Sequence, residues 1–317
     1  MLRPKFGRHP ELVLGSLLNE NIARIHRAWA SPPAFEAYKI RARRAHLQRI
    51  RALTHQRINT IIMKLAVTTT HSAPDAVISH AKSRAAALGL SFLPRIGNMD
   101  GMPADAFLIY GKRGVSFSAG GNVYRYHTGT AAVRILQLTR GAPDRLCALL
   151  PEGTKSVLDC TFGEGKDSLV LSYFLGNKAR VTALEKSLPL WEIGRDAIAR
   201  YEDKNEEITA ALRRIRLLRE DMKTFLETAE TGAYDVVYID TMFRAPVNRE
   251  KVNAEAFRAA ACPDIVTEDI YRQALRVASR AVILKERPFS KIFKQFPFTT
   301  IDTKHGQTTA YGIVWKI

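Results

Sequence analysis

The sequence predicts an α/β fold, in which a mostly parallel sheet carries helices on both faces and follows a smaller α/β segment. From about residue 151 short apolar runs alternate with helical stretches, which favours parallel strands because these need crossover connections. One apolar run ends in Asp159 and a turn with Gly163 and Gly165, after which a helix follows. Such a turn lets backbone approach a ligand and offers free N–H groups, so it predicts a site for a nucleotide-like cofactor. A later apolar run ends in Asp240, with Phe243 close behind it.

The composition narrows the class of protein. The 317 residues suffice for one large domain or two smaller ones with a full hydrophobic core. Cys147, Cys160 and Cys262 lie far apart, so we expect neither a disulfide framework nor a metal site, and a reducing cytoplasm fits. No apolar run reaches the roughly 18 to 20 residues that span a bilayer, so no membrane role is expected.

The net charge of +17 is concentrated at the N-terminus, where residues 1–62 contribute +9. The remaining +8 suits a polyanionic partner such as RNA, whose binding uses Lys and Arg to neutralise phosphates. By itself this charge is weak support, because many cytoplasmic proteins are basic without binding nucleic acid.

Residues 1–62 are predicted to form a basic helical extension, rich in Arg and His. Three interpretations stay open for it: an extension created by choosing too early a start codon, a basic arm for RNA, and an organelle-type presequence. A strand then begins abruptly near Met63, as many compact domains do.

Residues 63–142 are predicted to form a small α/β subdomain. The pattern indicates a strand over 65–70, an alanine-rich helix over 74–88, strands over 90–93 and 106–111, a hairpin over 114–126 and a helix over 128–140. Gly120-Gly121 marks the hairpin turn, and Gly141-Ala142-Pro143 is a natural break.

Residues 143–317 are predicted to form the main domain. Strands are expected over 156–160, 180–185, 215–219, 234–240 and 281–285, with helices over 166–175, 188–202, 221–229 and 264–279. The tail, from Phe298 to Thr303 and from Thr308 to Ile317, indicates a closing antiparallel hairpin. This layout is similar to that of class I, Rossmann-like methyltransferases.

Acids follow four successive strands of this pattern, at the edge where ligands of such sheets bind. If the layout holds, Asp159 and the turn from Gly163 to Gly165 would hold the amino-acid end of S-adenosylmethionine. Glu185 would bind the ribose hydroxyls and Asp221 the adenine amine. Each acid also has a structural interpretation: Asp159 as a cap, Glu185 as a solvated strand end and Asp221 as a helix N-cap.

A dinucleotide dehydrogenase is the neighbouring interpretation, because an acid about 20 residues after a glycine turn also serves the ribose of NAD. Ser168 stands where the third glycine of that fingerprint would be, and hydride transfer has no use for the Asp240 motif. We therefore favour methyl transfer.

Asp240-Thr241-Met242-Phe243 resembles the Asp/Asn-Pro-Pro-Tyr/Phe tetrad of methyltransferases that act on exocyclic amines. Asp240, helped by the Thr241 carbonyl, would accept a hydrogen bond from the amine and take up developing positive charge. Phe243 would stack on the base, although Met242 and Phe243 could also simply pack below the sheet.

From Met63 onward the sequence resembles the ribosomal small subunit methyltransferase J family and its uncharacterised relatives. The similar segments are Asp159 to Asp167, Ala183 to Lys186, Tyr238 to Phe243 and Lys285 to Pro288. The resemblance implies methylation of a guanine N2 amine in 16S rRNA with S-adenosylmethionine and no metal. It implies that the cofactor is bound by Asp159, Thr161, Gly163, Gly165, Asp167, Glu185, Lys186 and Asp221.

The chain departs from that family at three positions. Thr241 and Arg244 replace prolines, and Glu286 is inserted into the Lys-Arg-Pro element. These changes leave cofactor binding untouched and bear on the substrate, so a non-RNA substrate and an inactive RNA-binding relative remain alternatives.

Three further residues are candidates for substrate binding. Lys285 and Arg287 are expected to contact phosphate, with a solvated strand end as the alternative. His127 lies just before a helix, where relatives carry a similar aromatic-His element, and would cap the cofactor pocket or merely belong to a capping stretch.

Overall fold

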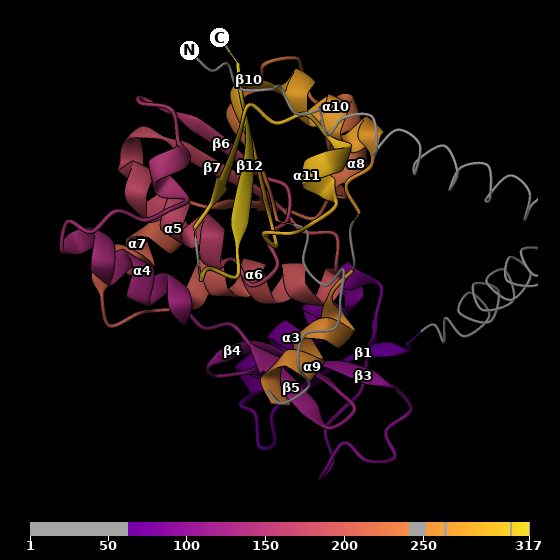
Figure 1. Ribbon diagram of the computed structural model, residues 1–317. Coiled ribbons are helices and arrows are strands. Elements are labelled where there is room, and N and C mark those ends of the chain that lie inside the picture. Colours follow the sequence, from indigo (N-terminus) through magenta and orange to yellow (C-terminus); the bar gives the residue numbers. More distant parts are fainter. Residues whose placement is uncertain (1–62, 241–251, 263–264, 305, 317) are drawn as a thin grey trace, which may run out of the picture. The chain divides into compact units, whose positions relative to one another are not determined.

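The computed structural model describes residues 63–240, 252–262, 265–304 and 306–316. Thr241 and Phe243, and the predicted extension over 1–62, lie outside them. From Lys64 onward the chain forms one compact unit. This unit contains two sheets, shown with their helices in Figure 1. The division of the chain at residue 142 stays a prediction.

The smaller sheet has five strands in the order β2-β1-β3-β4-β5. They are β1 (Leu65–Thr69), β2 (Ser91–Phe92), β3 (Ala106–Gly111), β4 (Gly114–Ala119) and β5 (Asn122–Arg125). β1 pairs in parallel with β2 and β3, whereas β3, β4 and β5 form an antiparallel meander. The predicted hairpin is confirmed, since Gly120 and Gly121 both have positive φ, 55° and 77°, as a two-residue hairpin turn favours.

The larger sheet has seven strands in the order β11-β12-β10-β9-β6-β7-β8. They are β6 (Ser156–Asp159), β7 (Arg180–Leu184), β8 (Arg216–Leu218), β9 (Tyr234–Asp240), β10 (Ala278–Glu286), β11 (Thr300–Thr303) and β12 (Ala310–Trp315). The first five are parallel, and β12 runs antiparallel to both β10 and β11. The mostly parallel sheet with its antiparallel C-terminal hairpin is therefore confirmed.

The helices are α3 (Asp75–Leu88), α4 (Thr130–Thr139), α5 (Lys166–Leu175), α6 (Leu188–Arg200), α7 (Glu206–Arg213), α8 (Met222–Thr228), α9 (Val252–Ala260), α10 (Glu268–Val277) and α11 (Ile292–Gln295). Two short 3-10 turns complete them, η1 (Cys147–Leu149) and η2 (Gly176–Lys178). The sequence patterns did not predict α7, α9 or α11. None of the described helices is long and apolar enough to cross a membrane.

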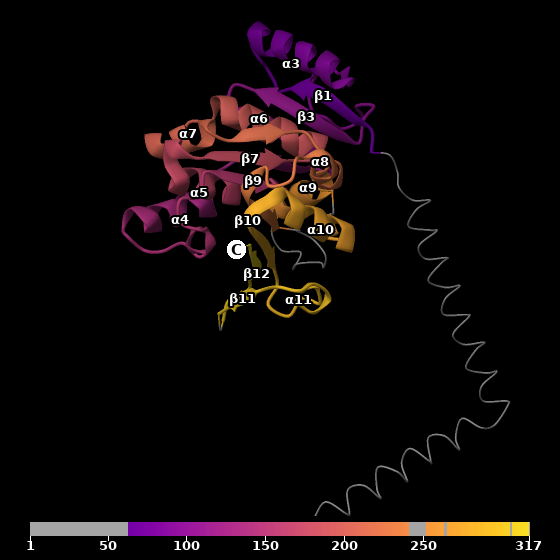
Figure 2. The ribbon, with the colours of Figure 1, turned by 90° about the horizontal axis from the view of Figure 1, so that it is seen from above.

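Helices cover both faces of the larger sheet, with α5 and α7 on one side and α8 and α10 on the other (Figures 1 and 2). The strands bury side chains in both directions, which β9 illustrates. Val237 and Ile239 belong to the core cluster that includes residues of α8 and α10. Val236 and Tyr238 belong to the cluster that includes Leu171 of α5. This two-sided burial explains why the strand is an almost continuous apolar run.

One helix, α6, contacts β4 of the smaller sheet and β8 of the larger one. Its Glu192 is fully buried and accepts hydrogen bonds from Arg84 of α3, Tyr110 of β3 and Arg195. Helix α9, which contacts α6, also contacts β4 and β5, and the ring of Phe257 meets that of Tyr124 edge-on at 5.0 Å. These contacts fasten the smaller sheet to the elements that carry the site.

Candidate active site

The candidate site lies at the carboxyl ends of the parallel strands in the larger sheet. Strand β6 is central, with β7 on one side and β9 on the other. The chain leaves β6 through the glycine turn into α5, at a point where the strand order reverses direction. Crevices of this kind are the usual ligand sites of open α/β sheets.

Glycines shape the turn between β6 and α5. Gly163 and Gly165 have φ values of 54° and 72°, a left-handed conformation that side chains disfavour. A Cβ at Gly165 would lie 2.4 Å from the ring of Phe162, and one at Gly194 of α6 would lie 2.5 Å from the same ring. The buried Phe162 thus wedges between two glycines and holds the turn close to α6.

Asp159 ends β6 and is almost completely buried. One carboxylate oxygen accepts a hydrogen bond from the Thr161 N–H at 2.9 Å, and the other accepts one from the Ser168 hydroxyl at 2.5 Å. Burial raises the pKa of Asp159 to about 7, although these two hydrogen bonds act against the rise. Ser168, which replaces the third glycine of a dinucleotide fingerprint, therefore stabilises the Asp159 carboxylate through a hydrogen bond.

Glu185 follows β7 and turns back towards the glycine turn. Its carboxylate accepts hydrogen bonds from the Gly163 N–H at 2.9 Å and from the Ser187 N–H at 2.7 Å. It is 8% exposed, so the interpretation as a solvated strand end is wrong. The contact joins Glu185 directly to the turn that starts α5.

Asp221 follows β8 and caps α8, accepting hydrogen bonds from the N–H groups of Lys223 and Thr224. The capping interpretation is therefore correct, and the side chain also forms an ion pair of 2.5 Å with Lys186. Although burial acts to raise the pKa of Asp221, the hydrogen bond from Lys186 leads the effects that lower it. Asp221 and Lys186 thus lie together beside the ends of β7 and β8.

Asp240 belongs to a partly buried cluster of charged groups. The Lys285 ammonium of β10 lies 2.6 Å from Asp240 and 2.7 Å from Asp167 of α5. Arg134 of α4 contacts Asp167 at 2.5 Å, and the Tyr238 hydroxyl donates a hydrogen bond to Asp167 at 2.7 Å. The cluster joins α4, α5, β9 and β10.

The charges of this cluster shift its pKa values in opposite directions. Burial would raise the pKa of Asp167, but the charges of Lys285 and Arg134 outweigh it and hold that pKa well below its usual range. Burial raises the pKa of Asp240 in spite of Lys285, and the nearby charge of Asp167 contributes. Burial would lower the pKa of Lys285, yet the two carboxylates raise it, so the ammonium stays charged.

Thr161 connects the glycine turn to this cluster. Its hydroxyl accepts a hydrogen bond from the Asp240 backbone N–H at 2.8 Å. Asp159 and Asp240 are therefore held on adjacent strands, β6 and β9, by one threonine between them.

The remaining predicted residues lie around this centre or outside it. His127 is exposed, and a Cβ at Gly129 would lie 2.7 Å from its ring and 3.3 Å from the Lys166 side chain at the start of α5. Arg287 is exposed just beyond β10, and its N–H donates a hydrogen bond to Glu286. Lys285 is not a solvated strand end, because two carboxylates surround its ammonium.

The sequence patterns missed Arg134, Tyr238 and Tyr124. Strand alternation could have found Tyr238, because it lies two residues before Asp240 and thus on the same face of β9. Tyr124 of β5 is buried, and the charges of Glu164 and Glu185 are close enough to affect its pKa, which burial raises. It comes from the smaller sheet, so no local signal tied it to the glycine turn.

Among the residues that the structure describes, no group of three or more His, Cys, Asp or Glu side chains could hold a metal ion. The potential ligands of the site are carboxylates, hydroxyls and backbone N–H groups around a glycine turn. These suit a ligand with ammonium, hydroxyl and amine groups.

Strand order, glycine turn and strand-end acids together define the class I methyltransferase fold. The chain matches the family described as "Putative SAM-dependent methyltransferase" over residues 114–311, more than half of its length, where SAM stands for S-adenosylmethionine. The chain therefore belongs to this family, and S-adenosylmethionine is its cofactor.

The chain is also similar to individual proteins, one of them uncharacterized and one of them a methyltransferase. The chain is 30% identical over 212 residues to the uncharacterized protein YpiP of Bacillus subtilis, covering 66% of this chain and 79% of that protein. It is 29% identical over 142 residues to ribosomal RNA small subunit methyltransferase J of Hydrogenovibrio crunogenus, covering 44% of this chain and only 50% of that protein.

A solved structure shares the fold. A SAM-dependent methyltransferase from Neisseria gonorrhoeae superimposes with a TM-score of 0.52 at 19% identity, covering 79% of this chain and 95% of that chain. At this identity the likeness concerns the fold alone.

Proposed function

We propose that this methyltransferase acts on an exocyclic base amine, the N2 of a guanine in small-subunit rRNA. The observation that carries the proposal is the position of Asp240, a partly buried carboxylate held by Lys285 and joined through Thr161 to the glycine turn. A cofactor on the turn and an amine at Asp240 would therefore meet at the ends of two adjacent strands.

We assign the methionine end of the cofactor to Asp159, Thr161, Gly163, Gly165 and Asp167, with Asp159 facing the ammonium. Glu185 would bind the ribose hydroxyls, and Lys186 with Asp221 the adenine side. In support, Glu185 accepts hydrogen bonds from the Gly163 and Ser187 N–H groups, so its carboxylate lies between the loops that follow β6 and β7. Bound there, S-adenosylmethionine supplies an electrophilic methyl group on a sulfonium.

Asp240 would accept a hydrogen bond from the amine and orient its lone pair towards the methyl carbon. As the nitrogen–methyl bond forms and the carbon–sulfur bond breaks, positive charge develops on the nitrogen, and a carboxylate stabilises it. The raised pKa of Asp240 makes it a better acceptor for the released proton than an ordinary aspartate. Lys285 keeps this carboxylate in place.

The other predicted substrate contacts complete the proposal. Thr241 and Phe243 would present a carbonyl and a stacking ring, Arg287 would face phosphate, and His127 would cover the cofactor. The phosphate contact predicted for Lys285 is not proposed, because two carboxylates hold its ammonium. The choice of rRNA rests on relatives named ribosomal RNA small subunit methyltransferase J, whose matches cover 50% and 64% of their lengths. An rRNA substrate would place the enzyme in the cytoplasm.

The proposal is tested by incubating purified enzyme and S-adenosylmethionine with unmodified small-subunit rRNA or with assembled subunits. Nucleosides are then analysed by mass spectrometry, and N2-methylguanosine is the expected product. Asp240→Asn should lower kcat about 100- to 1,000-fold, because it removes the charge that stabilises the transition state. Its affinity for S-adenosylhomocysteine should stay within about twofold of the unsubstituted enzyme.

Asp269→Asn is the matched control, since Asp269 is a partly exposed acid of α10 that pairs only with Arg272 among the described residues. It should methylate at the normal rate. Methyl transfer that survives ribonuclease treatment of the substrate preparation, or full activity of Asp240→Asn, would overturn the proposal.

A further inference from the structure

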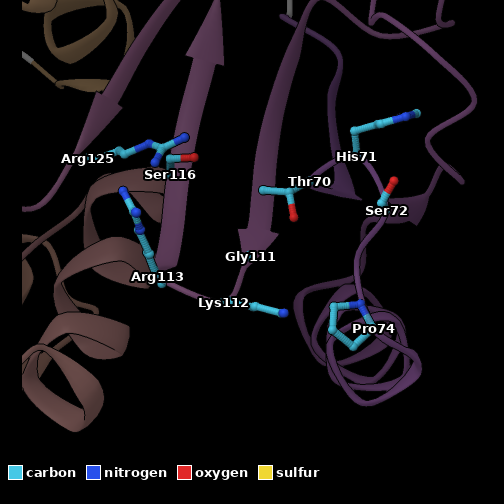
Figure 3. A pocket seen from close by; sticks show the side chains of 10 residues that line it. Thr70, His71, Ser72, Pro74, Gly111, Lys112, Arg113, Ser116 and Arg125 are labelled. Carbon is cyan, nitrogen blue, oxygen red and sulfur yellow. The ribbon is translucent and has the colours of Figure 1, made fainter.

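A hollow of about 360 Å³ opens at the smaller sheet, and none of its lining residues belongs to the glycine turn (Figure 3). It lies where the parallel strands β1 and β3 both end, which is the edge where ligands of parallel sheets bind. Its lining comes from the loop after β1, from the turn between β3 and β4, and from Arg125 of β5.

The lining is basic. Lys112, Arg113 and Arg125 are exposed, and no carboxylate lines the hollow with them. Their side chains form no ion pair with the carboxylates of the described residues. Three cations gathered without counter-charges around a concavity make a site that attracts anions.

The turn that carries two of these cations is tightly held. A Cβ at Gly111 would lie 2.7 Å from the Thr70 side chain, and one at Gly114 would lie 2.9 Å from the Asp196 carboxylate. The same carboxylate accepts a hydrogen bond from the Val115 N–H at 2.9 Å. Lys112 and Arg113 are therefore presented on a turn with a defined position, and less ordering is needed when they bind.

A second hollow of about 310 Å³ adjoins the first and shares Lys112, Arg113 and Arg125 with it. It adds Arg200 of α6 and the half-buried rings of Tyr126 and Tyr201. The carboxylate of Asp196 also lines it, but that group is engaged by Arg200 and by the Val115 N–H. The second hollow is therefore basic with an aromatic wall.

The second hollow is linked along the chain to the candidate active site. Tyr126 is followed by His127, which lies against Gly129 and close to Lys166, the first residue of α5. The chain thus connects the second hollow with the start of the helix that follows the glycine turn.

We propose that these two hollows together form a binding site for the phosphodiester backbone of the RNA substrate. The inference rests on the proposed function and adds to it the surface that holds RNA outside the catalytic centre. Two adjoining hollows that share their cations suit successive phosphates of one strand better than a single free anion. The tyrosine wall suits an unstacked base, as in other single-strand sites.

The test compares two triple variants of the full chain. Lys112→Gln/Arg113→Gln/Arg125→Gln removes the three shared cations. Lys178→Gln/Arg180→Gln/Arg216→Gln is the matched control, because these exposed residues lie at or just before the amino ends of β7 and β8, the opposite edge of the larger sheet from the glycine turn. Binding of a fluorescent unmodified small-subunit rRNA fragment is measured by anisotropy from 50 to 300 mM salt.

The first variant should bind RNA at least tenfold more weakly at about 150 mM salt. The slope of log affinity against log salt should fall by about 2, as expected for three lost phosphate contacts on a single strand. Affinity for S-adenosylhomocysteine should not change, which separates this effect from damage to the cofactor site. The control variant should lose clearly less affinity.

Equal RNA binding by the two variants, with RNA bound and methylated by the unsubstituted enzyme, would overturn this inference and leave the proposed function standing. An unsubstituted enzyme that neither binds nor methylates RNA would overturn both. A titration with inorganic phosphate tests whether the two hollows bind a free anion and not RNA. Phosphate binding that is lost in the first variant while its RNA affinity stays unchanged would mark a free-anion site and overturn the inference.

Discussion

At the scale of single residues, Asp159 is a carboxylate that burial keeps partly protonated near neutral pH. Its pKa of about 7 is set mainly by desolvation, with Ser168 and the Thr161 N–H opposing the rise. A cationic ligand group beside it would favour the ionised form and lower this pKa. Cofactor binding and ionisation of Asp159 are therefore expected to be coupled.

The coupling predicts that S-adenosylmethionine binding releases a proton between about pH 5.5 and 7. In this window the free protein holds a proton on Asp159 that the complex does not hold, so affinity rises with pH and levels off above about 7. Below the plateau the affinity for S-adenosylmethionine should fall by nearly tenfold for each pH unit. Isothermal titration calorimetry in buffers of different ionisation enthalpy measures the proton count.

Asp159→Asn provides the control for this coupling. It should bind more weakly but with a flat dependence on pH over the same window, since the titrating group is gone. Proton release that persists unchanged in Asp159→Asn would contradict the assignment.

Asp167 and Asp240 share one lysine, yet their pKa values shift in opposite directions because their other partners differ. Asp167 has Arg134 and the Tyr238 hydroxyl as additional partners, so its ionised form is stabilised and its pKa falls. Asp240 shares Lys285 with it, and its pKa rises. The group nearer the proposed acceptor is thus the more basic of the two.

At the scale of elements, the turn between β6 and α5 depends on the ring of Phe162 lying under Gly165. Gly165→Ala would force a left-handed residue and a contact of 2.4 Å with that ring. We expect a loss of about 2 to 4 kcal/mol in the free energy of unfolding, from backbone strain and overpacking together. Cofactor affinity should fall as well, because the turn must shift.

Gly153→Ala is the control for Gly165→Ala, since Gly153 has φ +70° against +72° and no atom within 4 Å of a Cβ. Gly153→Ala should lower the free energy of unfolding by the backbone strain alone, about 1 to 2 kcal/mol, and should leave cofactor binding unchanged. Urea unfolding of both variants gives the two free energies. Equal losses would show that the Phe162 contact contributes nothing.

Most elements follow from local patterns, and the exceptions have physical reasons. Helix α7 does carry a start signal, because Asn205 caps it and Glu206 and Glu207 stand in its first turn. Its eight residues are too few for a clear helical repeat of apolar positions, so the sequence pattern does not separate the helix from the strand that follows it. Helix α9 owes its position to packing on β4 and β5, which no local pattern contains.

At the scale of the whole molecule, Glu192 is the buried anion that joins α3, β3 and α6. Arg84, Arg195 and the Tyr110 hydroxyl all bond to it. Burial alone would raise its pKa, but the hydrogen bonds of Arg195 and Arg84 outweigh it and lower the pKa to about 2. Ionised Glu192 therefore favours the folded state.

This network predicts a loss of stability in acid. Since the folded pKa is depressed, its stabilisation is fully present above about pH 4.5 and is lost as the pH falls from there towards 2. The shift corresponds to about 3 kcal/mol. Glu192→Gln should lose about that amount at pH 7 and depend less on pH, as measured by urea unfolding between pH 3 and 7.

Glu206→Gln serves as the comparison for Glu192→Gln, because Glu206 is an exposed acid in the first turn of α7. It should remain within about 0.5 kcal/mol of the unsubstituted protein at pH 7. A Glu192→Gln variant that kept the full acid dependence would place the titrating group elsewhere.

The sequence by itself determined the type and order of most elements, the closing hairpin, the glycine turn and the acids at the strand ends. It could do so because alternation, helical period and turn chemistry act over a few residues. The resemblance to a methyltransferase family followed from the same local motifs, and the match over residues 114–311 confirmed the cofactor.

Only the tertiary structure decided how these groups act on one another. Strand order and burial determine three features of the site. These are the ion pairs of Lys285 with Asp167 and Asp240, the raised pKa of Asp159, and the hollows at the end of β3. A side chain's partners and its dielectric surroundings come from segments as far as 118 residues away, as for Lys285 and Asp167, so no local pattern contains them.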